Sequence, residues 1–232
     1  MRRPVVDYRT FRLSKINDPQ FSHLKLLLGW VGYFALYFIT ENFIPVETCY
    51  VIHSPLDDII PFCEIFVVPY VFWYLLIVIT LVYFALYNTD NFRRFQTFII
   101  ITQVVAMAIY IIFPNVQQLR PEEFARDNIF TQIVSIIYSV DTNTNVFPSL
   151  HVAYSLGIAS VWLKEKTASL PWKIFVVVAV ILICLSTAFI KQHSVLDGFA
   201  AIPICIAAEI AVYGKSYWKD YFSKRKIKKE QV

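Results

Sequence analysis

The sequence has too few charged residues for a water-soluble protein. Asp, Glu, Lys and Arg make up 16% of its 232 residues, against roughly 25% in an average soluble domain. Hydrophobic residues make up 57%, and the mean hydropathy is +0.55. So little charge cannot cover a surface that faces water on all sides, and we therefore expect a protein embedded in a lipid bilayer.

Two further absences narrow the fold and the chemistry. Strands of a membrane β-barrel alternate polar and apolar residues over about 10 positions, whereas this chain has long unbroken apolar runs and only 5 glycines. We therefore expect an all-α bundle of transmembrane helices. No Cys-x-x-Cys pair occurs among Cys49, Cys63, Cys184 and Cys205, which argues against a zinc or thioredoxin-like site. Cys49 and Cys63 fall near one predicted loop, where a disulfide bond between them is an open alternative.

The apolar runs predict six membrane-spanning helices in a single domain, 1–232. The first 23 residues are polar and mixed, so no cleavable signal peptide is expected. The domain comprises an N-terminal cytoplasmic segment (1–23), a helical core (24–213) and a basic tail (214–232). The expected spans are 24–44, 61–87, 95–113, 148–163, 172–190 and 194–213.

The basic residues predict the orientation of these helices. With the N-terminus in the cytoplasm, 18 of the 21 Lys and Arg residues fall on the cytoplasmic side, as the excess of basic residues in cytoplasmic loops requires. Both termini are therefore expected inside. A basic tail also suits nucleic acid, but beside membrane helices topology and anionic lipids explain it better, and no nucleic-acid partner is expected. Arg120, Arg126 and Lys191 are the exceptions on the outer side.

Three short segments with reactive side chains fall on that same outer side, at 119–121, 147–151 and 186–197. In the third segment, His193 and Asp197 are four residues apart and share one face of a helix. A carboxylate that accepts a hydrogen bond from one imidazole nitrogen leaves the other nitrogen free as a nucleophile or base. Taken alone, the pair is equally compatible with a capping histidine beside a solvated aspartate.

The second segment reads Pro148-Ser149-Leu150-His151. Proline suits the first turn of a helix, and the free backbone N–H groups of that turn bind anions. Ser149 adds a hydroxyl donor and His151 a general acid, although a plain helix cap explains the segment better when it is taken alone. Arg120 and Lys191 add positive charge suited to phosphate, and each by itself is typical of a solvated loop.

Together these residues resemble the type-2 phosphatidic acid phosphatase superfamily. The superfamily pattern is Lys-x6-Arg-Pro, then Pro-Ser-Gly-His, then Ser-Arg-x5-His-x3-Asp. The chain has Arg120-Pro121, then Pro148-Ser149-Leu150-His151, then Ser186 followed by His193 and Asp197 at the same spacing. The resemblance covers roughly residues 24–213 in the same order and topology.

Three positions depart from the superfamily pattern. Phe113 replaces the first lysine, Leu150 replaces the glycine, and Thr187 replaces the arginine of the third motif. Two phosphate-binding cations are therefore missing, and Lys191, one turn from Thr187, is expected to restore one of them. The Phe-Pro-Ser-Leu-His run also looks like the sphingolipid head-group transferases of this superfamily.

The resemblance implies a reaction without a metal or other cofactor. His193 is the expected nucleophile that forms a phosphohistidine, Asp197 orients it, and His151 protonates the leaving oxygen. Two histidines and a carboxylate also suit zinc, but Arg120 and Lys191 beside them would repel a cation. The expected phosphate-binding residues are Arg120, Ser149, Leu150 and Lys191.

We therefore expect a lipid phosphatase that hydrolyses a phosphomonoester or a pyrophosphate of a membrane lipid. A phosphotransferase that passes a phospho-head-group to a lipid alcohol uses the same residues, and a non-catalytic protein that binds or moves lipid is a third alternative. The expected partners are a lipid phosphate or pyrophosphate and the membrane lipids. On compactness, we expect a bacterial plasma membrane with the site facing outward, rather than an internal membrane with a lumenal site.

Overall fold

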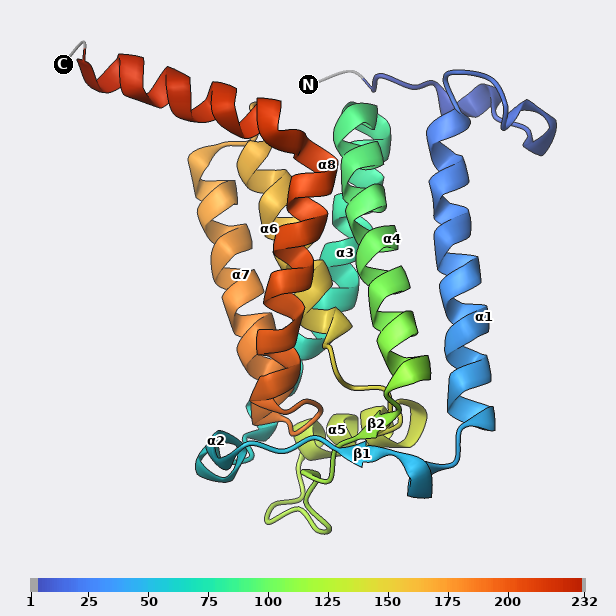
Figure 1. The fold of residues 1–232 in the computed structure, drawn as a ribbon, viewed down its shortest axis with the longest axis vertical. Helices are drawn as coiled ribbons and strands as arrows, with labels where there is room; N and C mark the ends of the chain where they lie inside the picture. The colour runs from blue at the N-terminus through green and yellow to red at the C-terminus, as the bar shows by residue number, and fades with distance from the viewer. Residues whose placement is uncertain (1–3, 231–232) are drawn as a thin grey trace.

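The structure is a computed structural model that describes the backbone of residues 4–230 and the side chains of residues 4–214. It is an upright helical bundle in which the first and the last described residues lie at the same end (Figure 1). We call this the terminal end and the opposite one the far end. The predicted all-α fold is confirmed, because the described strands, β1 (Tyr50–Val51) and β2 (Asn115–Val116), are only two residues long each.

Six helices of the described chain form the bundle. Five segments are long and apolar enough to cross a membrane: α1 with the 3-10 turn before it, α3 with the 3-10 turn before it, α4, α7 and the first part of α8. The sixth, α6, has 15 residues, which makes it about 22 Å long. The helix bounds are α1 (Leu28–Phe43), α3 (Val67–Tyr87), α4 (Thr89–Ile112), α6 (Leu150–Lys164), α7 (Leu170–Phe189) and α8 (Val195–Glu230).

The short helix α6 is the central one. It packs against α3, α4, α7 and α8, and nine of its residues are buried. A helix shorter than the roughly 30 Å hydrocarbon layer is tolerated here because neighbouring helices, and not lipid tails, surround it. Its first turn consequently lies inside the bundle near the far end.

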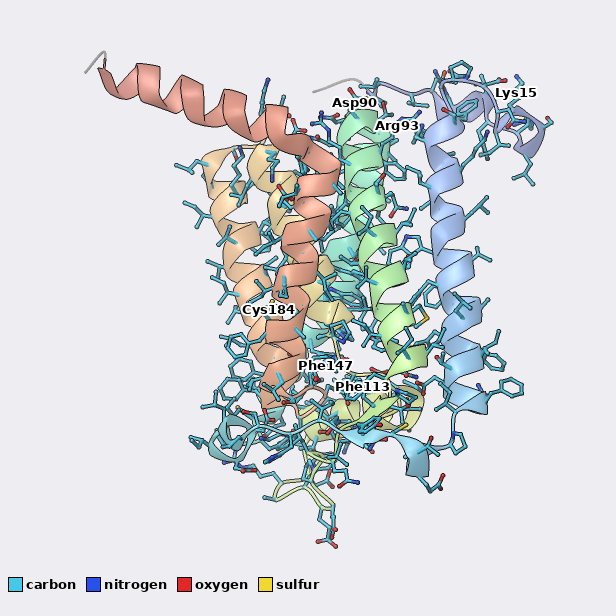
Figure 2. All side chains as sticks on the ribbon, in the orientation of Figure 1. Lys15, Asp90, Arg93, Phe113, Phe147 and Cys184 are labelled. Atoms are coloured by element: carbon cyan, nitrogen blue, oxygen red, sulfur yellow. The ribbon has the colours of Figure 1, made fainter. Side chains whose placement is uncertain are left out.

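The helix α4 begins six residues earlier than the sequence analysis predicted. Asn88 ends α3 and caps α4, since its side chain accepts a hydrogen bond from the backbone N–H of Asn91 at 3.1 Å. The side chain of a capping Asn satisfies a backbone N–H group that has no partner within the helix. Because Asn88 ends one helix and caps the next, it is the one residue that connects α3 and α4. Arg93 and Arg94 therefore lie on α4 and not in a loop. Figure 2 shows Asp90, Arg93 and Lys15 at the terminal end.

The last helix bends and continues beyond its predicted end at residue 213. Gly214 has φ 68° and ψ 167°, a conformation that glycine adopts at little cost. The continuation of α8 to Glu230 leaves the bundle at a steep angle to its axis (Figure 1). The side chains of the predicted basic tail lie outside the described residues.

The far end contains secondary structure between the predicted spans 95–113 and 148–163, where the sequence analysis expected no helix. It contains the helix α5 (Ile129–Val140) and the parallel pairing of β1 with β2, and a short helix, α2 (Pro55–Ile59), adjoins them. Asn128 and Thr131 form a reciprocal capping box at the start of α5, and Val134 and Ile137 are buried on one face. The sequence analysis placed no helix here because this apolar run of 12 residues is shorter than the roughly 17–25 residues that a membrane-spanning helix needs.

The packing of α6 against α4 generates a stability prediction. A Cβ atom added at Gly157 of α6 would lie 2.8 Å from the ring of Phe98, whereas one added at Gly32 of α1 meets nothing within 4 Å. Alanine is the better helix former at both positions by about 1 kcal/mol. We expect Gly157→Ala to lower the free energy of unfolding in detergent by about 1–3 kcal/mol relative to Gly32→Ala, because a tightly packed core must shift. Equal stability of the two variants would show that this contact is loose.

Candidate functional site

A cavity of about 320 Å³ lies near the far end of the bundle. Its walls come from α1, α3, α4 and α6, from the segment that links α5 to α6, and from the turn between α7 and α8. Phe113 and Phe147 are labelled near this level in Figure 2. Among the predicted site residues, those that line the cavity are Leu150, His151 and His193.

His193 and Asp197 make the contact that their spacing predicts. The Nδ1 atom of His193 lies 3.0 Å from Oδ2 of Asp197 and 3.1 Å from the carbonyl oxygen of Val146. Both neighbours are acceptors, so Nδ1 carries the proton and Nε2 keeps its lone pair. Asp197 is fully buried and its Oδ2 also accepts from the N–H of Ser194, which fixes the carboxylate as well as the ring.

His151 is the immediate neighbour of the free nitrogen of His193. The distance between His193 Nε2 and His151 Nδ1 is 3.4 Å. The His151 ring also packs against Trp73 and Tyr70, with ring centroids 4.4 Å and 4.7 Å apart. Its Nε2 atom is buried and has no hydrogen-bond partner among the described residues. The two imidazoles can therefore share or pass a proton while one nitrogen of His151 is free to serve a ligand.

The turn between α7 and α8 is held by α2. Asp57 of α2 accepts hydrogen bonds from Ser194 Oγ at 2.6 Å and from the N–H of Val195 at 2.9 Å. Lys191 has φ 56°, and its Nζ donates to the carbonyl oxygens of Asp57 and Ile60 at 2.7 Å and 2.6 Å. Burial lowers the pKa of the Lys191 ammonium, with the acidic side chains of α2 acting against this shift.

The structure does not place Lys191, one of the predicted phosphate-binding residues, at the cavity wall. The ammonium group does not line the cavity, and two backbone carbonyls already bind it. The side chain stabilises the turn that presents His193. The sequence could not show this, because the carbonyl oxygens come from a segment more than 130 positions away in the chain.

Arg120 also donates mainly to backbone oxygens. Its Nη1 binds the carbonyl of Tyr138 at 3.1 Å, and its Nη2 binds the carbonyls of Asp141 and Thr142 and the Oε1 of Gln192. The guanidinium lies over the ring of Tyr138 and outside the cavity wall. It is separated from the cavity by Gln192 and is not positioned as the phosphate clamp that the sequence predicted.

Ser149 and Leu150 occupy the start of α6. Ser149 is the helix cap, with its Oγ accepting from the N–H of Val152 at 3.3 Å, and it is fully buried outside the cavity wall. Ser149 therefore acts as a plain helix cap, as the sequence analysis allowed for this segment. Leu150 is the first helical residue and lines the cavity, so the first turn of α6 is directed toward it. Pro148 lies before the cap and not in the first turn.

The three departures from the superfamily pattern are accommodated locally. Phe113 stacks on Tyr50 with ring centroids 4.5 Å apart, and Thr187 Oγ1 donates to the carbonyl of Cys184 at 2.8 Å. The Leu150 side chain is buried. None of the three replaces a missing cation. The four cysteines are free, so the alternative of a Cys49–Cys63 disulfide bond is not realised.

Asp141 is the cavity residue that the sequence analysis missed. It follows α5 and lines the cavity. Its Oδ2 accepts from Gln192 at 3.0 Å and Tyr70 at 3.3 Å, and its Oδ1 accepts from Tyr37 at 3.4 Å. Burial raises the pKa of the Asp141 carboxyl, while His193 and Arg120 act against the rise. The sequence signal for Asp141 is an acidic residue directly after an amphipathic helix, and this signal is weak.

Comparisons with protein-family models, with curated proteins and with solved structures find no match to the chain. Among the described residues, no group of three or more His, Cys, Asp or Glu side chains is arranged to hold a metal ion. The site is therefore defined by its own geometry: two adjacent histidines, one of them oriented by a buried carboxylate, in a cavity between apolar helices.

The contacts of Lys191 predict a structural effect of its removal. We expect Lys191→Met to lower the free energy of unfolding in detergent by about 2–3 kcal/mol, because two carbonyls lose a charged donor. Lys173→Met is the matched control, since Lys173 Nζ donates to one exposed carbonyl, that of Leu163, and its loss should change the stability by less than about 0.5 kcal/mol. An unchanged stability of the Lys191 variant would contradict the structural role.

Proposed function

We propose that this chain is a membrane enzyme that transfers a phosphoryl group from a phosphate ester of a lipid to His193, and then to water. The observation that carries the proposal is the pairing of His193 with Asp197 and His151 at the wall of a cavity. A buried carboxylate that holds one imidazole nitrogen, with a second imidazole beside the other, is the arrangement of an activated nucleophile with an acid–base partner.

The mechanism follows from the tautomer of His193 and from the position of His151 beside its free nitrogen. His193 Nε2 attacks phosphorus and forms an N–P bond, and Asp197 stabilises the positive charge that develops on the ring. His151 donates a proton to the leaving oxygen, and in the second step it accepts a proton from the attacking water. The 3.4 Å contact between the two rings is a weak hydrogen bond, and the phosphoryl group replaces it when the substrate binds.

A lipid substrate is supported by the walls of the cavity. One wall is an aromatic face of α1 formed by Trp30, Tyr33, Phe34 and Tyr37. α1 packs mainly against α4 and stands apart from the other helices (Figure 1). Apolar surface of this kind accepts the glycerol backbone and the first part of a hydrocarbon chain. The basic residues of the sequence favour an outward-facing site with both termini in the cytoplasm.

Replacing the nucleophile tests the proposal most directly. Purified protein incubated with chelator and a lipid phosphate labelled at phosphorus is expected to form an acid-labile, base-stable phosphohistidine, because no step requires a metal. His193→Ala should abolish both the labelled intermediate and turnover. His53→Ala is the matched control, since His53 is an exposed histidine paired with Asp58, and it should label at the wild-type level.

Labelling of the His193 variant would reject the assigned nucleophile. A wild-type protein that binds lipid phosphates but neither labels nor turns them over would favour the non-catalytic alternative. Label that leaves the enzyme only when an alcohol is added would identify a phosphotransferase.

Asp197 is expected to act through His193. Asp197→Asn keeps the size of the side chain but removes the charge that stabilises the imidazolium, and it permits the wrong tautomer of His193. We expect kcat to fall by about 100-fold or more with little change in KM. Asp58→Asn, at an exposed carboxylate, should leave both constants unchanged. A rise in KM alone in the Asp197 variant would assign Asp197 to substrate binding instead.

A further inference from the structure

The short helix α2 buries a carboxylate and exposes apolar side chains. Of the five residues that the structure describes in α2, Asp57 is the one that is buried. Its exposed fraction is 3%, whereas Leu56 and Ile59 are 50% and 75% exposed. The next carboxylate in the chain, that of Asp58, is exposed as well. Burial of a carboxylate is costly unless hydrogen-bond donors surround it, so the contacts of Asp57 must compensate for this orientation of the helix.

A helix cap accounts for only one of the contacts of Asp57. Its Oδ2 accepts from the backbone N–H of Ser54 at 2.8 Å, which closes the capping box of α2. The same oxygen also accepts from Ser194 Oγ at 2.6 Å, and Oδ1 accepts from the N–H of Val195 at 2.9 Å. Ser194 and Val195 are more than 130 positions away, at the start of α8. Asp57 therefore joins a local cap to the turn that presents His193.

Ser194 connects the buried carboxylates of Asp57 and Asp197. Its Oγ–H donates to Asp57, and its backbone N–H donates to Oδ2 of Asp197 at 3.0 Å. That Oδ2 also accepts from Nδ1 of His193 at 3.0 Å, whereas Oδ1 of Asp197 has no hydrogen-bond partner among the described residues. Within the described part of the chain, the N–H of Ser194 is therefore the one donor besides His193 that orients this carboxylate.

We propose that Asp57 and Ser194 are positioning residues for the nucleophile His193. Asp57 fixes Ser194, Ser194 fixes the Asp197 carboxylate, and that carboxylate fixes the imidazole ring. Asp57, Ser194 and Asp197 do not line the cavity, so they act on the reaction through His193 and not by touching a substrate. This inference rests on the proposed function and adds to it Asp57, which lies outside the three reactive segments of the sequence. A reacting atom misplaced by about 1 Å reacts roughly 100-fold more slowly, so each of these contacts affects the rate.

The segment that carries Asp57 has further contacts with the same turn. The Nζ of Lys191 donates to the backbone carbonyls of Asp57 and Ile60, and the N–H of Cys63 donates to the carbonyl of Phe189 at 2.9 Å. None of these contacts uses the carboxylate of Asp57. They hold α2 in place whether or not that side chain is charged, so a change confined to the carboxylate releases the start of α8 and leaves the segment where it is.

Asp57→Asn tests the proposal through the kinetic constants for a lipid phosphate. The amide oxygen still accepts from the N–H of Val195, but the NH2 group cannot accept from Ser194 Oγ. We expect kcat to fall by about 10–100-fold and KM to change by less than about twofold, because the cavity wall is unchanged. Asp58→Asn is the matched control. It makes the same change of charge at the next position of α2, on an exposed side chain, and should leave both constants unchanged.

Ser194→Ala removes the same contact from its other end. The methyl group cannot donate to Asp57, whereas the backbone N–H of residue 194 still donates to Asp197. We expect kcat to fall by a factor similar to that of the Asp57 variant. If the two side chains act through one contact, the double variant should be slower than the slower single variant by no more than about twofold, because coupled effects do not add. Effects that multiply would show that Asp57 does not act through Ser194.

The ring of His193 provides a measurement that needs no substrate. Nitrogen NMR of the full-length protein with labelled histidine rings distinguishes a protonated ring nitrogen from a bare one, and the spectrum of His193→Ala identifies the His193 signals. In the wild-type protein we expect the single tautomer with the proton on Nδ1, as its two acceptors require. Asp57→Asn should add the second tautomer, because the Asp197 carboxylate is no longer fixed. Asp58→Asn should give the wild-type spectrum.

The inference requires both a lower kcat and a second tautomer in the folded Asp57 variant. A wild-type value of either one would overturn it, and so would a loss of activity that only follows the loss of folded protein. If Asp57→Asn does not fold, Ser194→Ala, which removes no charge, decides by the same two measurements. A wild-type protein that neither labels nor turns over any lipid phosphate would reject the proposed function, and the spectra alone would then decide whether Asp57 orients His193.

Discussion

The conformation of the turn between α7 and α8 is the constraint on which the candidate site depends. The first N–H groups of a helix have no partner within it, and Ser194, just before α8, is buried away from solvent. Asp57 and Asp197 satisfy this end of α8 from two directions. The Lys191 ammonium then anchors the residue with the left-handed backbone to α2. His193 is presented from this turn in one orientation.

A second constraint is the short central helix. Because α6 is enclosed by α3, α4, α7 and α8, its first turn lies within the bundle and carries His151 to the wall of the cavity. Tyr110 holds the preceding segment through a 2.8 Å hydrogen bond to the carbonyl of Pro148. The two histidines thus come from the first turn of α6 and from the turn just before α8, two helices that both begin near the far end.

The same residues serve different roles from those that a motif suggests. Ser149 caps a helix and Lys191 fastens a turn, although both fall at or near positions associated with phosphate binding. In a medium of low dielectric constant, a backbone carbonyl competes strongly for any nearby cation. A cation at the right position in the sequence is therefore not necessarily available to a substrate.

The sequence by itself determined the membrane environment, the all-α fold and the approximate positions of the bundle helices, because apolar runs of about 20 residues have few other stable arrangements. It also offered the His193–Asp197 contact as one of two alternatives, since side chains four residues apart at the start of a helix lie close together, and the structure shows that contact. Only the tertiary structure decided that His151 touches His193, that Asp141 lines the cavity, and that Arg120 and Lys191 are bound by carbonyls. These contacts join segments between 18 and 134 positions apart, and the periodicity of a sequence carries no information about contacts at such separations.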